Sequence, residues 1–248
     1  NKPPTIEIKN LNFKYDTDQE LTLENINLSI PAGGTIGIFG STGSGKTTLA
    51  KLLSLSEPIQ SGDVLIDGTS IQSANLSSIR ESIATVPQRR FLFSSSISDN
   101  ISFCDPNNMP FEIRKSAAER ACVIDDIESF PNQWDTLVGE KGIILSGGQQ
   151  HRLALARAYA SNHHILILDD VLSSVDHDTE QQMIQAIYSI NNRPTTIIIS
   201  HRISAIEPCD QIIILDNGKI IDQGTHDQLI SKPGAYQATW NYQQLELE

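Results

Sequence analysis

The sequence predicts an α/β fold with a parallel-sheet core, an antiparallel β annex at the N-terminus and an inserted helical lobe. Residues 5–13 and 21–30 alternate apolar and polar side chains, as antiparallel strands do when one face is buried. Strand signals vanish between residues 88 and 164, where helical patterns replace them. Other short runs are continuously apolar, which is typical of strands buried on both faces of a parallel sheet. These runs are residues 35–39, 165–168 and 195–200.

The composition describes an ordinary acidic globular domain. With 248 residues, 39% of them hydrophobic, the chain is long enough for one large domain with a full core. The 18 Lys and Arg against 30 Asp and Glu give a net charge of −12, which argues against nucleic acid as the main partner. The three cysteines are scattered and lack metal spacing, so we expect a reducing compartment. No apolar run approaches the roughly 18 residues needed to cross a bilayer, which favours a soluble domain.

The interval without strand signals is expected to hold two helices. Residues 110–122 have a helical pattern that begins at a proline, and residues 149–159 have one that follows a Gly-Gly pair. We therefore expect one domain, residues 1–248, divided into a core lobe and a helical lobe. The expected bounds are about 1–88 and 158–248 for the core lobe and about 89–157 for the helical lobe.

The sheet is expected to resume after the helical lobe and to end in a hairpin. Residues 211–216 and 219–223 have strand patterns, and the Asn217-Gly218 pair between them is a strong hairpin-turn signal. Two short helices are expected after the hairpin.

A glycine-rich motif of the form G-x-x-x-x-G-K-[ST] follows the apolar run at 35–39 directly, and residues 48–53 continue it as a helix with leucines on one face. Glycines let successive backbone N–H groups converge on phosphate oxygens at the positive end of that helix. The lysine supplies a mobile cation for the β- and γ-phosphates, and the threonine hydroxyl is placed to bind Mg²⁺. The alternative is a plain Gly/Ser-rich turn. The candidate nucleotide-binding residues are Gly40, Ser41, Thr42, Gly43, Ser44, Gly45, Lys46, Thr47 and Thr48.

A second hydrophobic strand ends in two carboxylates. Asp169 follows a buried run at the carboxyl end of its strand, where α/β sheets place their ligands. Combined with the phosphate loop, Asp169 is expected to complete the Mg²⁺ shell with Thr47. Asp170 is a candidate base, or a residue that orients the attacking water. The alternative for Asp170 is a solvated carboxylate at a strand end.

The sequence Leu145, Ser146, Gly147, Gly148, Gln149 precedes an arginine-containing helix. A serine hydroxyl and two unhindered glycine N–H groups at a helix start form a second anion site. Leu-Ser-Gly-Gly-Gln is also the signature of ATP-binding cassette (ABC) ATPases. Together with the phosphate loop, it makes the chain closely resemble the nucleotide-binding domain of an ABC transporter.

The resemblance implies the ABC ATPase fold, with ATP and Mg²⁺ as ligands. In that family two domains pair head to tail, so the signature of one chain closes over the γ-phosphate held by the other. A second ABC ATP-binding domain, in a homodimer or a heterodimer, is therefore the expected partner.

The resemblance also implies further site residues, each with a simpler alternative. Tyr15 lies where the family stacks an aromatic ring under adenine, the alternative being a surface aromatic. Gln88 matches the glutamine that senses Mg²⁺ and the attacking water and joins sheet to lobe, against an ordinary loop glutamine. Asp176, in residues 173–176, resembles the loop that crosses the dimer seam, although a helix N-cap is the rival. His201 matches the histidine that contacts the γ-phosphate, against an inert histidine.

Within the family the chain is similar to exporters. Residues 138–142 look like the exporter motif that touches the coupling helices of transmembrane partners, and residues 92–101 are also exporter-like. The start, Asn-Lys-Pro-Pro, has no Met and resembles a linker, so we expect an upstream membrane domain and a location on the cytoplasmic face of a membrane. The expected function is ATP binding and hydrolysis that powers export of a substrate through ATP-driven dimerisation.

The sequence departs from the family pattern at Asp170, where the usual residue is Glu. A carboxylate shorter by one methylene is withdrawn from the water, and an error of about 1 Å can cost on the order of 10²-fold in rate. The alternative function is therefore a regulatory ATP-binding half of a heterodimeric exporter, with weak hydrolysis at its own site. A third class, a soluble ABC ATPase of DNA repair or translation, is disfavoured by the net charge of −12 and by residues 138–142.

Overall fold

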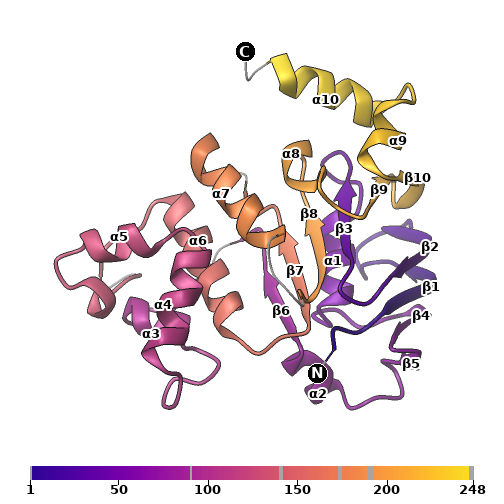
Figure 1. Ribbon diagram of the computed structural model, residues 1–248. Helices are drawn as coiled ribbons and strands as arrows, with labels where there is room; N and C mark the ends of the chain where they lie inside the picture. The colour runs from indigo at the N-terminus through magenta and orange to yellow at the C-terminus, as the bar shows by residue number, and fades with distance from the viewer. Residues whose placement is uncertain (1, 90, 140–141, 173–174, 189–192, 246–248) are drawn as a thin grey trace. The chain divides into compact units, whose positions relative to one another are not determined.

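The computed structural model describes residues 2–89, 91–139, 142–172, 175–188 and 193–245 (Figure 1). The chain forms two compact units. The sheet unit comprises Asn1–Thr85, His164–Asp170 and Asn192–Glu248. The helical unit comprises Val86–His163 and Val171–Asn191. The α/β class, with a parallel sheet, an antiparallel annex and helices, is as predicted, whereas the lobe bounds expected from the sequence stay a prediction.

The main sheet of the sheet unit is largely parallel, with strand order β10-β9-β3-β8-β7-β6. Strand β3 pairs in parallel with β8 and β9, β7 pairs in parallel with β8, and β9 and β10 form the predicted antiparallel hairpin. Every residue of β3, β7 and β8 is buried, which confirms the interpretation of the three continuously apolar runs. The strands are β3 Thr35–Phe39, β6 Ile83–Val86, β7 Ile165–Asp169, β8 Thr195–Ile199, β9 Gln211–Asp216 and β10 Lys219–Gly224.

The annex is an antiparallel sheet with strand order β2-β1-β4-β5. Its first two strands were predicted, and they pair with Ile6 opposite Ile30 and Ile8 opposite Leu28. These apolar side chains join the buried residues of β3 and of helix α1 in one hydrophobic core. The core therefore fixes the helix that follows the phosphate loop against both sheets. The annex strands are β1 Ile6–Phe13, β2 Leu23–Ile30, β4 Ser61–Ile66 and β5 Thr69–Ser70.

The helices of the sheet unit are mostly short. The expected helix after the phosphate loop and the two expected terminal helices are present, as α1, α9 and α10. In the described part of the chain, no helix has both the length and the apolar composition that a membrane span requires. The helices are α1 Lys46–Leu53, α2 Leu76–Glu81, α8 Ile203–Ile206, α9 His226–Ile230 and α10 Ala235–Leu245.

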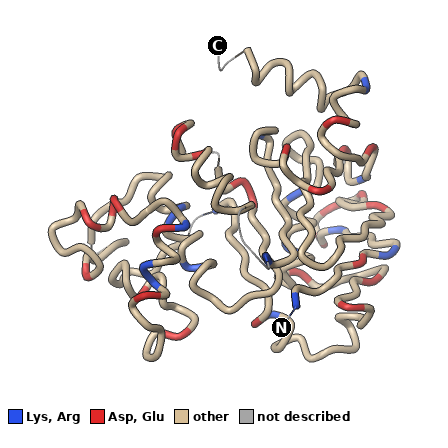
Figure 2. The backbone as a smooth tube through the Cα atoms, in the orientation of Figure 1, with Lys and Arg blue, Asp and Glu red and all other residues tan. Residues whose placement is uncertain are grey.

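The helical unit is built around α6, which packs against α3 and α4. The two predicted helices are present, and the proline expected to start the first of them is its N-cap residue, Pro110. Lys and Arg are spread among the more numerous acidic residues of both units (Figure 2). The helices are α3 Ile97–Ile101, α4 Phe111–Arg120, α5 Ile124–Ser129, the 3₁₀ turn Gln133–Asp135, α6 Gly147–Ala160 and α7 His177–Tyr188.

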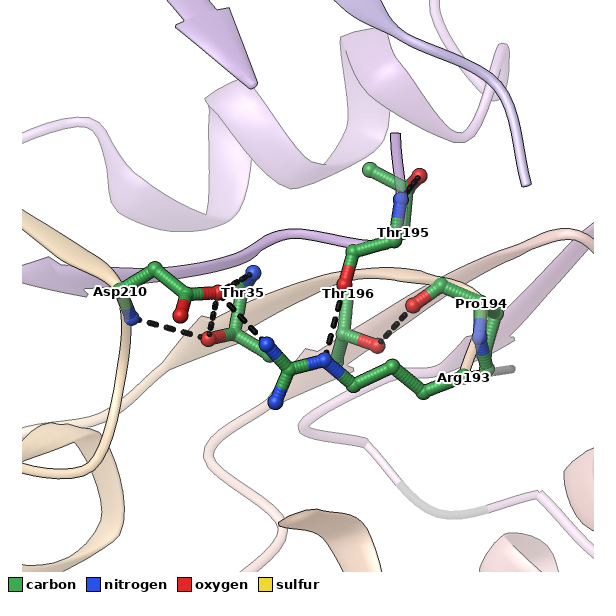
Figure 3. A network of polar contacts seen from close by, with 7 residues as sticks. Thr35, Arg193, Pro194, Thr195, Thr196 and Asp210 are labelled. Carbon is green, nitrogen blue, oxygen red and sulfur yellow. Dashed lines mark hydrogen bonds and ion pairs between the residues drawn. The ribbon is translucent and has the colours of Figure 1, made fainter. Parts of the chain in front are cut away.

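A polar network fastens the amino ends of the central parallel strands (Figure 3). Asp210 Oδ2 accepts hydrogen bonds from the N–H and hydroxyl of Thr35, at 2.7 and 2.8 Å, and from Arg193 Nη2 at 2.8 Å. Arg193 Nε donates in turn to Gly33 O at 2.8 Å. Because β3 begins at Thr35 and β9 follows Asp210, these bonds fix the register of the two strands. The phosphate loop lies at the opposite end of β3.

We expect Asp210→Ala to lower the free energy of unfolding by about 1 kcal/mol, a modest value because the half-exposed carboxylate is screened by solvent. Burial acts to raise the pKa of Asp210, but the Thr35 hydrogen bonds and the Arg193 guanidinium outweigh it and leave the pKa below its ordinary value. The stabilisation is therefore complete above about pH 4 and is lost as the pH falls through the folded-state pKa.

Urea denaturation at several pH values measures this difference, with Asp16→Ala in an exposed turn as the matched control. Equal stability of Asp210→Ala and the parent chain at pH 7 would show that the network does not fasten the strands.

Candidate functional site

The glycine-rich loop, residues 40–45, leads from the end of β3 into α1. A Cβ at Gly40 would lie 2.2 Å from the carbonyl oxygen of Leu215, so a side chain has no room there. Gly45 has a φ of 103°, and a Cβ there would lie 2.7 Å from a methyl group of Leu23. Glycine is required at Gly40 because the Leu215 backbone lies close to it, and at Gly45 because of its left-handed backbone, as the motif predicted.

Lys46 folds back over this loop. Its Nζ donates hydrogen bonds to the carbonyl oxygens of Gly40 and Ser41, each at 2.7 Å. Burial lowers the pKa of the lysine, while Asp169 and Asp170 act in the opposite direction. The ammonium group is thus partly desolvated and surrounded by backbone dipoles, a setting in which an added anion is strongly attracted.

Asp169 ends strand β7 and is 4% exposed. Burial raises the pKa of its carboxyl group above the ordinary value, although a hydrogen bond with the Thr47 side chain acts in the opposite direction. A buried carboxylate beside a hydroxyl suits Mg²⁺, which prefers hard oxygen ligands. In the described residues, no group of three or more His, Cys, Asp or Glu is placed to hold a metal by itself.

Asp170 has a φ of 54°, in the left-handed region that side chains rarely adopt. Its N–H donates to Ile199 O at 2.8 Å, and its Oδ1 lies 2.9 Å from Nδ1 of His201, an ion-pair contact when the imidazole is protonated. Asp170 is 13% exposed at its side chain and His201 is 58% exposed. The Asp170 carboxylate raises the pKa of His201, and burial opposes it more weakly. The structure thus pairs two residues that the sequence had placed in the site separately.

Tyr15 lies just beyond β1 and is half-buried against α1. Its hydroxyl is 3.3 Å from the Thr48 Oγ1. The ring meets Phe13 edge to face at 4.9 Å, and Lys51 Nζ lies 5.6 Å from the ring centroid. These contacts fix the ring beside the first turns of the helix that follows the phosphate loop. Its role beneath an adenine ring stays a prediction.

The signature sequence begins helix α6 of the helical unit. Ser146 is the N-cap: its hydroxyl oxygen accepts from the Gln149 N–H at 3.2 Å, and Gln149 Oε1 accepts from the Ser146 N–H at 2.9 Å. Gln150 Nε2 donates to Leu145 O at 2.9 Å. The reciprocal pair is a capping box, which fixes the helix start. The N–H groups of Gly147 and Gly148 lie in the first turn, at the positive end of the helix dipole.

Asp126 of α5 holds this helix start, and nothing in the local sequence had indicated it. Its Oδ1 accepts from Gln149 Nε2 at 2.8 Å, and its Oδ2 accepts from Arg152 Nη2 at 2.5 Å. The partners are 23 and 26 residues away along the chain. The one sequence feature that could have indicated an acidic partner is Arg152 itself, because helix α6 contains no Asp or Glu to pair with it.

Gln88 is exposed and lies directly after β6, in the helical unit. The segment that follows it is tied to α6 by Arg157, whose Nη1 donates to Phe91 O at 3.0 Å and whose Nε donates to Asn100 O at 2.8 Å. The helix that begins at the signature therefore also positions the chain that follows Gln88.

Asp176 is exposed, and its Oδ1 accepts from the Thr179 N–H at 3.0 Å in the first turn of α7. This bond lowers the pKa of Asp176. This bond has the geometry of the helix N-cap that the sequence offered as the alternative, and the role of Asp176 at a dimer seam stays a prediction. Ser173 and Ser174 of the same motif, and Glu140 and Lys141 of the exporter-like motif, lie outside the described residues.

Comparison with known proteins places the chain in a family. The sequence profile described as ABC transporter matches residues 23–173. The chain belongs to the ABC transporter family. An "ATP-dependent lipid A-core flippase" of Haemophilus influenzae (strain 86-028NP) is 40% identical over 238 residues, covering 96% of this chain and 40% of the flippase. "ABC transporter B family member 24, mitochondrial" of Arabidopsis thaliana is 37% identical over 247 residues, covering 100% of this chain and 36% of that protein.

A solved "bacterial Atm1-family ABC exporter with ATP bound" superposes with a TM-score of 0.92 at 35% identity, covering 98% of this chain and 42% of that chain. The ABC domain described here therefore spans about two fifths of the length of these relatives. The matches identify it as an exporter-type nucleotide-binding domain, which confirms the resemblance drawn from the two motifs. ATP is accordingly its ligand.

We expect Asp126→Ala in this ABC domain to lower the free energy of unfolding by about 2 kcal/mol, because it leaves the largely buried Arg152 guanidinium without its carboxylate. Urea denaturation measures the change. Asp125→Ala is the matched control, since Asp125 is exposed in the same first turn of α5. A loss no larger than that of the control would mean that Asp126 does not hold the signature helix.

Proposed function

We propose that this chain binds ATP together with Mg²⁺ at the phosphate loop, hydrolyses it, and so powers export of a substrate across a membrane by the larger protein to which it belongs. The observation that carries the proposal is the group formed by Lys46, Thr47 and Asp169. It combines a partly desolvated cation, which donates to two loop carbonyls, with a carboxylate that is 4% exposed and whose pKa the Thr47 side chain acts to lower. A triphosphate and its Mg²⁺ ion require these two settings. The "ATP-dependent" flippase and the exporter "with ATP bound" support the same activity.

Each site residue of the sheet unit has a proposed role in binding the nucleotide. The backbone N–H groups of residues 40–45 and the Lys46 ammonium bind the β- and γ-phosphates, and Tyr15 stacks under the adenine ring. Thr47 and Asp169 hold Mg²⁺, which neutralises charge on the phosphate oxygens when bound. In the proposed site the phosphate loop thus binds the phosphates, the end of β7 holds Mg²⁺, and the end of β1 contacts the adenine ring.

Asp170 and His201 are proposed to act on the attacking water and the γ-phosphate. The Asp170 carboxylate orients the water or accepts its proton. Because Nδ1 of His201 lies 2.9 Å from Asp170 Oδ1, Nε2 is the ring nitrogen left for the γ-phosphate. Asp170 also raises the pKa of His201, so the ring can carry both protons and donate from Nε2 to a phosphate oxygen.

The helical unit is proposed to act on the nucleotide of a partner chain. The Ser146 hydroxyl and the N–H groups of Gly147 and Gly148 would bind a γ-phosphate held by a second ABC domain, either another copy of this chain or an unlike one. Gln88 would contact Mg²⁺ and the attacking water, and Asp176 would lie at the seam between the two domains. A transmembrane domain is the other proposed partner, with the ABC domain on the cytoplasmic face, because the relatives are exporters and are more than twice as long as this chain.

A second candidate function is a regulatory ATP-binding half of a heterodimeric exporter that hydrolyses ATP weakly. The contact between Asp170 and His201 favours it. The short carboxylate stands where the family has Glu, and one of its oxygens is already engaged by Nδ1 of His201 at 2.9 Å.

We expect Lys46→Ala to weaken Mg²⁺-ATP binding by at least about tenfold, or about 1.4 kcal/mol, because the variant removes the cation that meets the phosphates. Isothermal titration calorimetry measures the affinity. Lys219→Ala removes an equal charge from an exposed ion pair with Glu24 and should leave the affinity unchanged. An unaltered affinity in Lys46→Ala would remove the assignment of this loop to phosphate.

Asp170→Glu and Asp170→Asn together separate the two candidate functions. If the short carboxylate only lies too far from the water, Asp170→Glu should raise ATP turnover by up to about 10²-fold, equivalent to roughly 2.7 kcal/mol of barrier. Asp170→Asn should lower whatever turnover the parent chain has, because an amide cannot accept the proton.

Steady-state phosphate release measures both variants, in a dimer whose opposing signature is intact. If neither variant alters turnover while ATP binding is normal, the carboxylate takes no part in hydrolysis and the regulatory function is favoured.

A further inference from the structure

The C-terminal helix α10 contacts the loop that carries His201. Near the end of this helix, the side-chain amide of Gln243 makes two hydrogen bonds to that loop. Its Nε2 donates to the carbonyl oxygen of His201, and its Oε1 accepts from the N–H of Ile203, both at 2.9 Å. One amide therefore holds the backbone on both sides of Arg202.

The His201 loop depends on this amide for a cap. Helix α8 begins at Ile203, and its N-cap residue, Arg202, makes no side-chain capping hydrogen bond. The first N–H groups of a helix have no partner within the helix, so they need one from elsewhere. Gln243 supplies it for Ile203 from a position 40 residues further along the chain. Within the turn, the Arg202 N–H also donates to the Ser200 hydroxyl oxygen at 2.9 Å.

Helix α10 is itself anchored near its start. Tyr236 is 1% exposed and meets Phe39 edge to face at 5.2 Å. Its hydroxyl lies 2.9 Å from Nδ1 of His226, whose ring also packs against Trp240 at 4.7 Å. Phe39 is the residue before the phosphate loop, so the start of the helix is fixed to β3, and the Gln243 hydrogen bonds join its end to the His201 loop.

We propose that Gln243 is a positioning residue for His201. By fixing the carbonyl of His201 and the N–H of Ile203, it sets where Nδ1 of the ring meets Asp170 and where Nε2 is presented. Presentation of Nε2 to a γ-phosphate rests on the proposed function, whereas the contact with Asp170 does not. The charged groups that act on the ring are Asp170, Arg202 and Lys46.

The test compares Gln243→Met with Gln244→Met in the whole 248-residue chain. Methionine keeps the length and helix preference of glutamine but makes neither hydrogen bond. Gln244 is the exposed neighbour on the same helix and serves as the matched control. Gln243→Asn keeps the amide but withdraws it by one methylene, so it tests reach with polarity retained. The first readout is the pKa of His201 from an NMR titration without nucleotide, and the second is the separation of kcat from KM for ATP.

We expect the His201 pKa to fall toward its ordinary value of about 6.5 in both Gln243 variants and to stay at the parent value in Gln244→Met. For the hydrolysing protein we expect kcat to fall by about tenfold with little change in KM, because the ring is misplaced while the ATP-binding groups are intact. A His201 titration in both Gln243 variants that coincides with the parent chain would overturn the proposal. Absence of hydrolysis in the parent chain would instead bear on the proposed function, and the titration would still decide the role of Gln243.

Discussion

The incomplete charge balance between Lys46 and Asp169 is the constraint on which the rest of this structure depends. Burial lowers the pKa of the lysine and raises that of the aspartate, so each charged form is held at a cost in desolvation. An anionic triphosphate would offset the desolvation of the Lys46 ammonium, and a divalent cation would offset that of the Asp169 carboxylate. Each group is therefore better stabilised when a ligand of the opposite charge binds beside it, and Mg²⁺-ATP carries both charges.

The surrounding fold keeps these groups in place from two directions. At the amino ends of the strands, Asp210 fixes β3 to β9 through Thr35. At the carboxyl end, α10 packs on Phe39 through Tyr236 and reaches the His201 loop through Gln243. Strand β3 is short and fully buried, and the phosphate loop follows its last residue, Phe39. The Asp210 network and helix α10 thus fasten the two ends of the strand that leads into the phosphate loop.

The sequence predicted those parts of the fold whose cause is local. Strands β3, β7 and β8 are buried along their whole length, and for that reason their sequences are continuously apolar. Gly40 is required because the backbone of Leu215 lies too close to it for any side chain. Strands β4 and β6 were not predicted, since β4 opens with Ser-Gly-Asp and most of its residues are only partly buried, which leaves a weak alternation. Both were formed by pairing with strands distant in the sequence.

The site was predicted to a similar extent. The motifs located the phosphate loop and the signature, because each is continuous in the sequence. The sequence did not indicate the long-range contacts that position the site residues. Asp126 bonds Gln149 of the signature from 23 residues away, and Gln243 bonds His201 from 42 residues away. No periodicity or motif records such contacts. Asp176 shows the converse, since its N-cap geometry is local and the sequence had offered it as the alternative.

Comparison of ATP binding with and without Mg²⁺ in the parent chain and in Asp169→Asn tests the central claim most directly. If Asp169 is the carboxylate that makes the site a Mg²⁺-nucleotide site, Mg²⁺ should tighten ATP binding to the parent chain by about tenfold or more, equivalent to about 1.4 kcal/mol. The same addition should have little effect on Asp169→Asn, whose affinity for ATP in a chelator should be no weaker than that of the parent chain. Full retention of the Mg²⁺ effect in Asp169→Asn would contradict the account.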